Sequence, residues 1–275
     1  YWEDKTISDL ASSYMSEKTK ECIANGVFTV GNYFFGGVGH IIIDYDKAIR
    51  RGYKAIIQDA VEALESFDCN DPDFIQKTQF CKAIITVLSA AINFAKRYSD
   101  KAKEMAAVET NPTRKAELLQ IAANCEKVPA NGATNFYEAC QSFIITQMIL
   151  QVESSGHSES QSFWFVQQLL QMESSGHSIS PGRFDQYMYP YLEKDLASGA
   201  ITKDFAQELL DCVFVKLNDL NKVRDQISAQ AFAGFQVFQN IGAGGQTEDG
   251  MDATNELSYM MMETVAHLHL SAPSF

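Results

Sequence analysis

Residues 173–191 read ESSGHSISPGRFDQYMYPY, and this stretch carries most of what the sequence indicates about the fold. A Gly-His-Ser turn follows an apolar helical segment. Ser180 and Pro181 have the order of an N-cap followed by proline at the first helical position, which predicts a new helix. Gly199 is expected to end that helix and Thr202 to cap the next one.

The same turn occurs twice, because residues 141–160 are repeated as residues 161–180 with 13 of 20 positions identical. Each copy is a short apolar helix followed by Ser-Ser-Gly-His-Ser. Two copies are too few for a solenoid, which needs at least about three repeats. The repeat therefore indicates a local tandem duplication, and it permits two registers of the chain.

The second copy is predicted to hold the functional position. His177 and Ser178 run directly into the capped helix at Pro181, whereas Ser158 is followed by Glu159, whose carboxylate would be costly to bury unpaired. The alternative register places His157 and Ser158 there, and it is supported by the continuity of residues 136–141 with the first copy's helix.

Helical periodicity dominates the rest of the chain, and no Ser- or Pro-rich linker divides it, so residues 1–275 are expected to form one domain. The expected fold class is α/β and predominantly helical, with short strands at 27–30 and 236–245. Further predicted features are helices over 8–25, 71–105 and from Pro112 towards Cys125, and caps at Asp44, Asn111, Asn135 with Glu138, and Asp252.

Composition excludes several classes of protein. The net charge of −13 disfavours nucleic acid and anionic membranes as partners. No run of 18 apolar residues exists, so no membrane span is expected. The six cysteines include no CxxC pair, which favours reduced thiols and a cytoplasmic protein, without disulfides or zinc. The chain begins with Tyr1, has no signal peptide and stops at Phe275 within an extended segment, so both ends are expected to be cut.

Histidines flanked by glycine are the candidate chemical groups, because imidazole exchanges protons near neutral pH. His40 follows Gly-Gly-Val-Gly, and His157 and His177 lie in the repeated turns. His267 and His269 are interpreted as structural. No metal-binding motif occurs, and the Gly-rich segment 242–245 lacks the Lys-Ser/Thr of a phosphate-binding loop.

Several segments beside 173–191 carry a resemblance to a known family: KTISDLA (5–11), NYFFGGVGH (32–40), KLNDLNKVRD (216–225) and GGQ (244–246) leading into DATN (252–255). Together they resemble the glycyl radical enzymes of the pyruvate formate-lyase superfamily, and within it the cobalamin-independent glycerol dehydratases. The resemblance covers nearly the whole chain.

The resemblance implies a fold and an activity. Residues 1–275 would be an N-terminal to central piece of a ten-stranded barrel wrapped by helices, in an enzyme that eliminates water from glycerol to give 3-hydroxypropionaldehyde. His40 would supply the proton to the leaving hydroxyl, and His177 and Ser178, or His157 and Ser158, would hold the substrate. No cofactor would be bound. The parent enzyme would be an anaerobic homodimer with a protein glycyl radical, installed by an iron–sulfur activase that uses S-adenosylmethionine.

Two family motifs are missing from the sequence: the Gly-Cys-Val-Glu loop with the thiyl cysteine, and the Arg-Val-x-Gly-Tyr loop with the radical glycine. The isolated chain is therefore expected to be inactive. Two other functions remain open. One is dehydration of 1,2-propanediol or another glycyl radical lyase reaction. The other, from a different class, is a non-catalytic helical scaffold or interaction protein.

Overall fold

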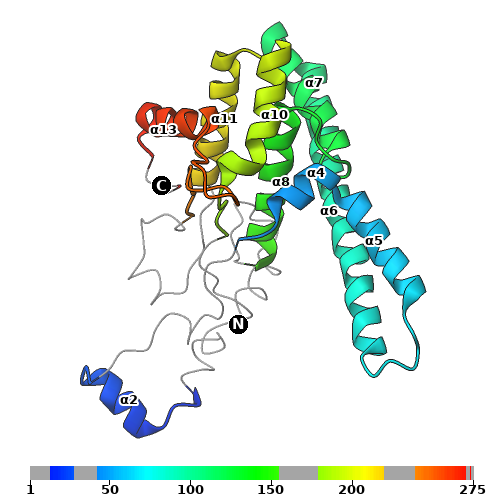
Figure 1. Ribbon diagram of the computed structural model, residues 1–275, viewed down its shortest axis with the longest axis vertical. Coiled ribbons are helices and arrows are strands. Elements are labelled where there is room, and N and C mark those ends of the chain that lie inside the picture. Colours follow the sequence, from blue (N-terminus) through cyan, green and yellow to red (C-terminus); the bar gives the residue numbers. More distant parts are fainter. Residues whose placement is uncertain (1–12, 28–41, 155–178, 220–238, 271–272, 274–275) are drawn as a thin grey trace.

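The computed structural model describes residues 13–27, 42–154, 179–219, 239–270 and 273, and within them the secondary structure is helical (Figure 1). No strand lies in these ranges, so the predominantly helical character is confirmed for them. The helices are α2 (Glu17–Ala24), α4 (Tyr45–Arg51), α5 (Tyr53–Ser66), α6 (Phe74–Val108), α7 (Pro112–Lys127), α8 (Phe136–Ser154), α10 (Phe184–Ser198), α11 (Lys203–Asp219) and α13 (Glu256–Leu268).

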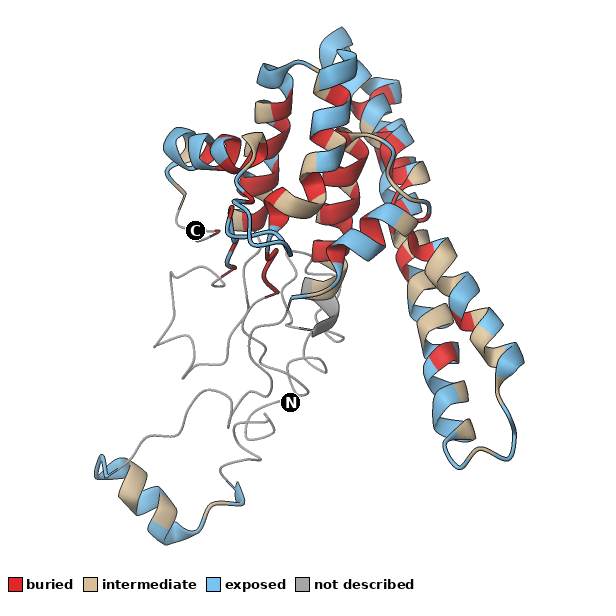
Figure 2. Cartoon of the chain, in the orientation of Figure 1, coloured by how far each residue is buried: buried red, intermediate tan, exposed pale blue. Residues whose placement is uncertain are grey.

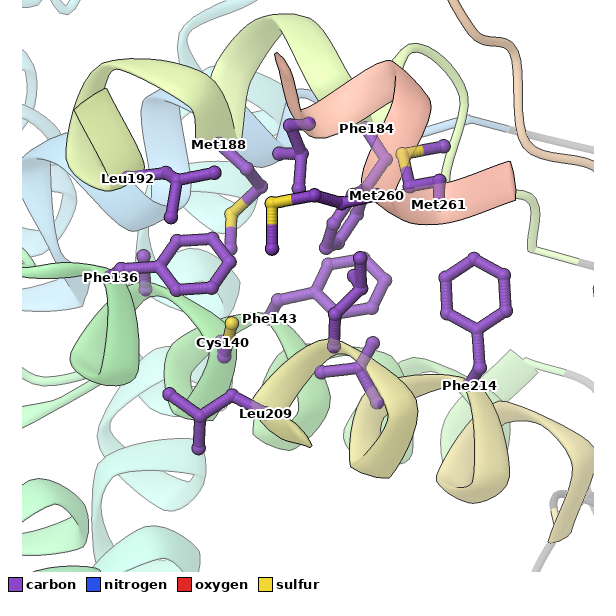
Figure 3. Packing of buried hydrophobic residues seen from close by; sticks show 14 of the residues in the cluster. Phe136, Cys140, Phe143, Phe184, Met188, Leu192, Leu209, Phe214, Met260 and Met261 are labelled. Atoms are coloured by element: carbon purple, nitrogen blue, oxygen red, sulfur yellow. The ribbon is translucent and has the colours of Figure 1, made fainter. Parts of the chain in front are cut away.

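The main core lies where α8, α10, α11 and α13 meet (Figure 2). Aliphatic, aromatic and sulfur-containing side chains fill it, and Figure 3 shows them pointing towards one another from all four helices. Phe143 of α8 packs edge-on against Phe184 of α10, with ring centroids 5.0 Å apart. Burying such side chains contributes roughly 1.5–3 kcal/mol each before the entropy of ordering them is counted.

Helices α5, α6 and α7 pack consecutively along one side of this core, and α5 with one half of α6 projects away from it (Figure 1). The contact face of α6 consists of small residues such as Ala91, Ala95 and Ala102, which let the neighbouring helices approach closely. By length and composition α6 is also the one helix, among the residues the structure describes, that could cross a membrane. In the apolar 18-residue stretch of α6, 17% is buried inside the protein.

Several helix ends agree with the sequence. Asn111 caps α7 through its side chain, with Pro112 in the first turn. Gly199 ends α10 in the left-handed conformation, at φ 70°. Asp44 accepts from the Lys47 N–H at 3.0 Å, and Thr202 accepts from the Phe205 N–H at 3.2 Å. These caps are local, so the local sequence is sufficient to predict them.

Two predicted helix starts are wrong. Ser180 and Pro181 do not open a helix, because the Ser180 hydroxyl accepts from the Asn240 N–H at 3.2 Å and α10 begins only at Phe184. Asp252 does not cap α13, because its carboxylate accepts from the Thr254 N–H. Asn255 caps α13 instead and forms a capping box with Ser258. The start expected at Ser8 lies outside the described residues, and within the described part of 8–25 helix α2 begins at Glu17 and is capped by Ser16.

One other prediction holds in part, and the strand expected at 236–245 is not found in its described residues. Asn135 accepts from the Glu138 N–H at 2.8 Å, as a capping box requires, but the Glu138 carboxylate pairs with Lys127 and Thr134 rather than reaching back. Of the strand expected at 236–245, the described part contains one isolated parallel bridge, between Gly182 and Ile241. The strand expected at 27–30 lies outside the described residues except for Val27.

Candidate functional site

The histidines and serines expected to carry chemistry lie outside the described residues: His40, His157, Ser158, His177 and Ser178. The structure does describe the points where their segments join the helical body. Tyr45 stands five residues after His40, and Ile179 directly follows Ser178. Ser154, at the end of α8, precedes His157 by three residues.

Two of these joining points, Tyr45 and Ile179, meet at one buried amide, the side chain of Gln147 on α8. Its Nε2 donates to the main-chain carbonyl of Ile179 at 2.7 Å and to Oε1 of Gln239 at 2.9 Å. Its Oε1 accepts a hydrogen bond from the hydroxyl of Tyr45. Each polar atom of the amide is therefore paired, as a buried amide requires. We call Tyr45, Gln147, Ile179 and Gln239 the amide hub.

Gln239 also connects the amide hub to α11, because its Nε2 donates to the Leu217 carbonyl near the end of that helix at 3.0 Å. Gln147 and Gln239 are both 0% exposed, so water cannot replace these bonds. Burial raises the pKa of Tyr45 well above the ordinary value for a phenol, which keeps its hydroxyl protonated as a donor. The hub is thus a neutral, satisfied network that holds backbone in place.

A second buried group fixes the Gly-rich segment 242–246. Oδ2 of Asp185 accepts from the Gly244 N–H at 2.6 Å and from the Ser258 hydroxyl at 2.5 Å. The guanidinium of Arg183 donates to the carbonyls of Gly244 and Gln246, at 2.5 and 3.0 Å. Because the Gly244 N–H already donates to the Asp185 carboxylate, it is not available to bind a phosphate. The segment is a loop held by hydrogen bonds within the protein.

The exit of the second Gly-His-Ser turn is joined to the same loop. Ser180 accepts from the Asn240 N–H, and the Gly242 N–H donates to the Gly182 carbonyl at 2.8 Å. Gly182 adopts φ +68°, a conformation that suits glycine and turns the chain into α10. Residues 179–183 and 239–246 are therefore hydrogen-bonded into one unit, which includes Ile179 and Gln239 of the amide hub.

Two of the buried thiols, Cys125 and Cys140, are poor nucleophiles. All six cysteines are free, and three of them, Cys81, Cys125 and Cys140, are buried. Burial raises the pKa of Cys125 to about 11 and raises that of Cys140 further, so neither is a thiolate at neutral pH. These two thiols are therefore structural, and the described residues around them support a site without supplying its reactive groups.

The two C-terminal histidines lie away from the amide hub. His269 takes the left-handed position that ends α13, at φ 50°. His267 lines an open, polar surface pocket between α11 and α13, with Nδ1 3.4 Å from the Asp211 carboxylate. No group of three or more histidine, cysteine or acidic side chains in the described ranges could hold a metal ion.

The sequence pattern predicted neither the amide hub nor the contacts of Asp185 with Gly244 and Ser258. Glutamine and tyrosine in apolar helices have no distinctive spacing, and their partners are 32 to 102 residues away. One weak signal was present, because Gln147 and Gln167 are among the positions that are identical in the two copies of the repeat.

Comparison with protein families matches the chain to "Pyruvate formate lyase-like", over residues 1–160 and 160–275. The match divides where the first copy of the repeat ends. Among curated proteins, (2S)-3-sulfopropanediol dehydratase of Klebsiella oxytoca is 35% identical over 99% of this chain and 31% of its own length.

Two solved structures are similar throughout. The glycerol-bound B12-independent glycerol dehydratase of Clostridium butyricum has 48% identity and a TM-score of 0.82, over 99% of this chain and 32% of its own. A structure from Roseburia inulinivorans that concerns 1,2-propanediol dehydration has 45% identity and a TM-score of 0.84, over the same shares of the two chains. The chain thus spans about a third of the length of these relatives.

Proposed function

The chain belongs to the pyruvate formate lyase-like family of glycyl radical enzymes, and from that premise we propose that it forms part of the substrate pocket of a dehydratase that converts glycerol to 3-hydroxypropionaldehyde. The observation that carries the proposal is the 48% identity to a glycerol-bound dehydratase over 99% of this chain. The similar proteins named above are dehydratases of glycerol, 1,2-propanediol and sulfopropanediol, which supports a small polyol as substrate.

Three residues of this chain would act on the polyol. His177 and Ser178 would hydrogen-bond the substrate hydroxyls, since a buried polyol needs each hydroxyl paired. His40 would donate its proton to the hydroxyl that leaves from C2, so that the group departs as water. The radical that removes hydrogen from C1 would be supplied by family loops that the 275-residue sequence lacks.

The amide hub supports a common pocket for these residues. Five residues of chain reach at most about 18 Å, which limits the distance of His40 from Tyr45. Ser178 is one peptide from Ile179, so its Cα lies about 3.8 Å from that of Ile179. Because Tyr45 and Ile179 both bind Gln147, the two segments start from one buried point. The same arrangement allows His157 and Ser158 as the alternative pair, since they follow the end of α8.

Further properties of the intact enzyme belong to the same proposal. It would act in the cytoplasm of an anaerobic cell as a homodimer, after an S-adenosylmethionine-dependent iron–sulfur activase installs its glycyl radical. Dehydration of 1,2-propanediol is the second candidate function, favoured by the 45% identity and TM-score of 0.84 to the Roseburia inulinivorans structure. A non-catalytic scaffold is the third candidate, from a different class of function.

A chimera tests the proposal. The aligned third of the Clostridium butyricum glycerol dehydratase is replaced by this chain and purified anaerobically with an activase and S-adenosylmethionine. We expect a glycyl radical signal and dehydration of glycerol, with a higher kcat/KM for glycerol than for 1,2-propanediol. His40→Ala should abolish turnover while the radical signal stays.

Each other outcome selects a different function. Preference for 1,2-propanediol would overturn the glycerol assignment and support the second candidate. A folded chimera that carries the radical but dehydrates neither polyol would support the scaffold function.

A further inference from the structure

We propose that Gln147 is a positioning residue of the polyol site, which fixes the exit of the Gly-His-Ser turn by holding the Ile179 carbonyl on the helix of the first repeat copy. The site itself rests on the proposed function, but the position of the exit does not. The bond spans 32 residues and crosses from one copy of the repeat to the other. The helix is thus taken from the first copy and the exit from the second.

Two core contacts explain why the first copy provides the helix. Ile145 is 1% exposed and packs against Ala95 and Cys125. The second copy has Phe165 at the equivalent position, and a benzyl group in this space would overpack the core by about 1–3 kcal/mol.

The other contact is polar. The buried hydroxyl of Tyr53 lies 2.8 Å from Oγ1 of Thr146, whose own proton goes to the Ser142 carbonyl at 2.7 Å. The second copy has Val166 at the equivalent position, which would leave the Tyr53 hydroxyl without this partner. Both substitutions disfavour the second helix in this place, although Gln167 would present the same amide.

A few hydrogen bonds and peptide units connect Gln147 to the residues of the proposed site. Its amide holds the carbonyl of Ile179, and Ser178 is the preceding residue. The same Nε2 holds Gln239, which directly precedes the Asn240 N–H that pairs with Ser180. Loss of the Gln147 donors should therefore loosen residues 179–183 and 239–246 together, before the helical core is affected.

Hydrogen exchange on the full 275-residue chain tests this inference. The informative amides are those of Asn240 and Gly242, which donate to Ser180 and Gly182. Gln147→Met removes both donors at similar volume, and Gln167→Met is the matched control in the second copy. We expect exchange at both amides to accelerate about tenfold or more in Gln147→Met, and less than twofold in the control. Unchanged exchange in Gln147→Met, or acceleration by Gln167→Met alone, would overturn the proposal.

Two further variants keep the test decisive. If Gln147→Met fails to fold, Gln147→Asn is used instead. It keeps the two N–H donors but moves them one methylene further from the Ile179 and Gln239 oxygens, so a smaller acceleration of exchange is expected. In Gln147→Glu the new carboxyl group faces two oxygens, so it donates only when protonated. Exchange corrected for its intrinsic pH dependence should slow again as the pH is lowered towards 5. A merely packing role for residue 147 predicts no such recovery.

Activity separates this inference from the proposed function. In an active chimera, Gln147→Asn should raise the KM for glycerol more than it lowers kcat, since Gln147 touches no reacting atom. An inactive chimera combined with accelerated exchange would reject the polyol site but keep Gln147 as the anchor of Ile179. An active chimera with unchanged exchange would reject the anchor alone.

Discussion

The side-chain amide of Gln147 donates to the main-chain carbonyl of Ile179 at 2.7 Å, and so joins the helix of one repeat copy to the exit of the other. Between Ser154 at the end of α8 and Ile179 lie residues 155–178, which contain both Gly-His-Ser turns. A chain with a single copy could make the same bond with 20 fewer residues.

The first prediction therefore concerns removal of 20 residues. Deleting 155–174 or deleting 159–178 gives the same sequence, ESSGHSISPGRF after Val152, so the choice of register disappears. We expect the variant to fold and to gain about 1–2 kcal/mol, because a shorter connection loses less entropy on closure. Urea unfolding monitored by circular dichroism measures the change. Loss of cooperative unfolding would show that the removed residues are part of the core.

The second prediction concerns the copy-specific contact of Thr146. Thr146→Val should lower the free energy of unfolding by about 1–2 kcal/mol, because the buried Tyr53 hydroxyl loses its partner. Thr86→Val is the matched control, since Thr86 bonds only to its own helix at an exposed position and should change stability by less than about 0.5 kcal/mol. Equal effects in the two variants would contradict the role of Thr146.

The third prediction concerns Gly52, which joins α4 to α5 at φ +73°. A Cβ there would lie 2.3 Å from the Asn131 carbonyl carbon, so Gly52→Ala should cost more than about 3 kcal/mol. Gly26 has a similar φ of +69° with nothing within 4 Å. Gly26→Ala should therefore show only the cost of the left-handed backbone, about 1 kcal/mol. Thermal unfolding compares them, and similar midpoints would contradict the close approach at Gly52.

The fourth prediction concerns pH and Glu138. Burial alone would raise its pKa, but hydrogen bonds from Lys127 and Thr134 outweigh burial and hold the pKa below its usual value. A depressed folded-state pKa stabilises the protein above the unfolded pKa, near 4.3, and the contribution is lost as the pH falls through the folded-state value. Glu138→Gln should cost about 1–2 kcal/mol at pH 7 and progressively less below about pH 4. A difference that does not change with pH would contradict this.

The fifth prediction concerns the radical. The 275-residue sequence contains neither the thiyl cysteine loop nor the radical glycine loop of the family. Incubation of this chain with an activase and S-adenosylmethionine should give no glycyl radical doublet by electron paramagnetic resonance and no aldehyde from glycerol. The chimera with the Clostridium butyricum enzyme is the positive control. A doublet on the chain alone would contradict the prediction.

The sequence by itself determined the family, the helical character of the described part and the local caps, because each depends on neighbouring residues. Asn111 before Pro112 and Gly199 after α10 specify helix ends within one turn. Only the tertiary structure decided what Ser180 does, because its hydroxyl binds an N–H 60 residues away instead of capping a helix. It also showed that the first copy of the repeat supplies α8 to the core. The two copies have similar apolar sequence patterns, and the fit of the first depends on a hydroxyl at position 146 that meets Tyr53 and on a side chain of the size of Ile145 beside Ala95. Such fits depend on partners brought together by folding, so no local pattern contains them.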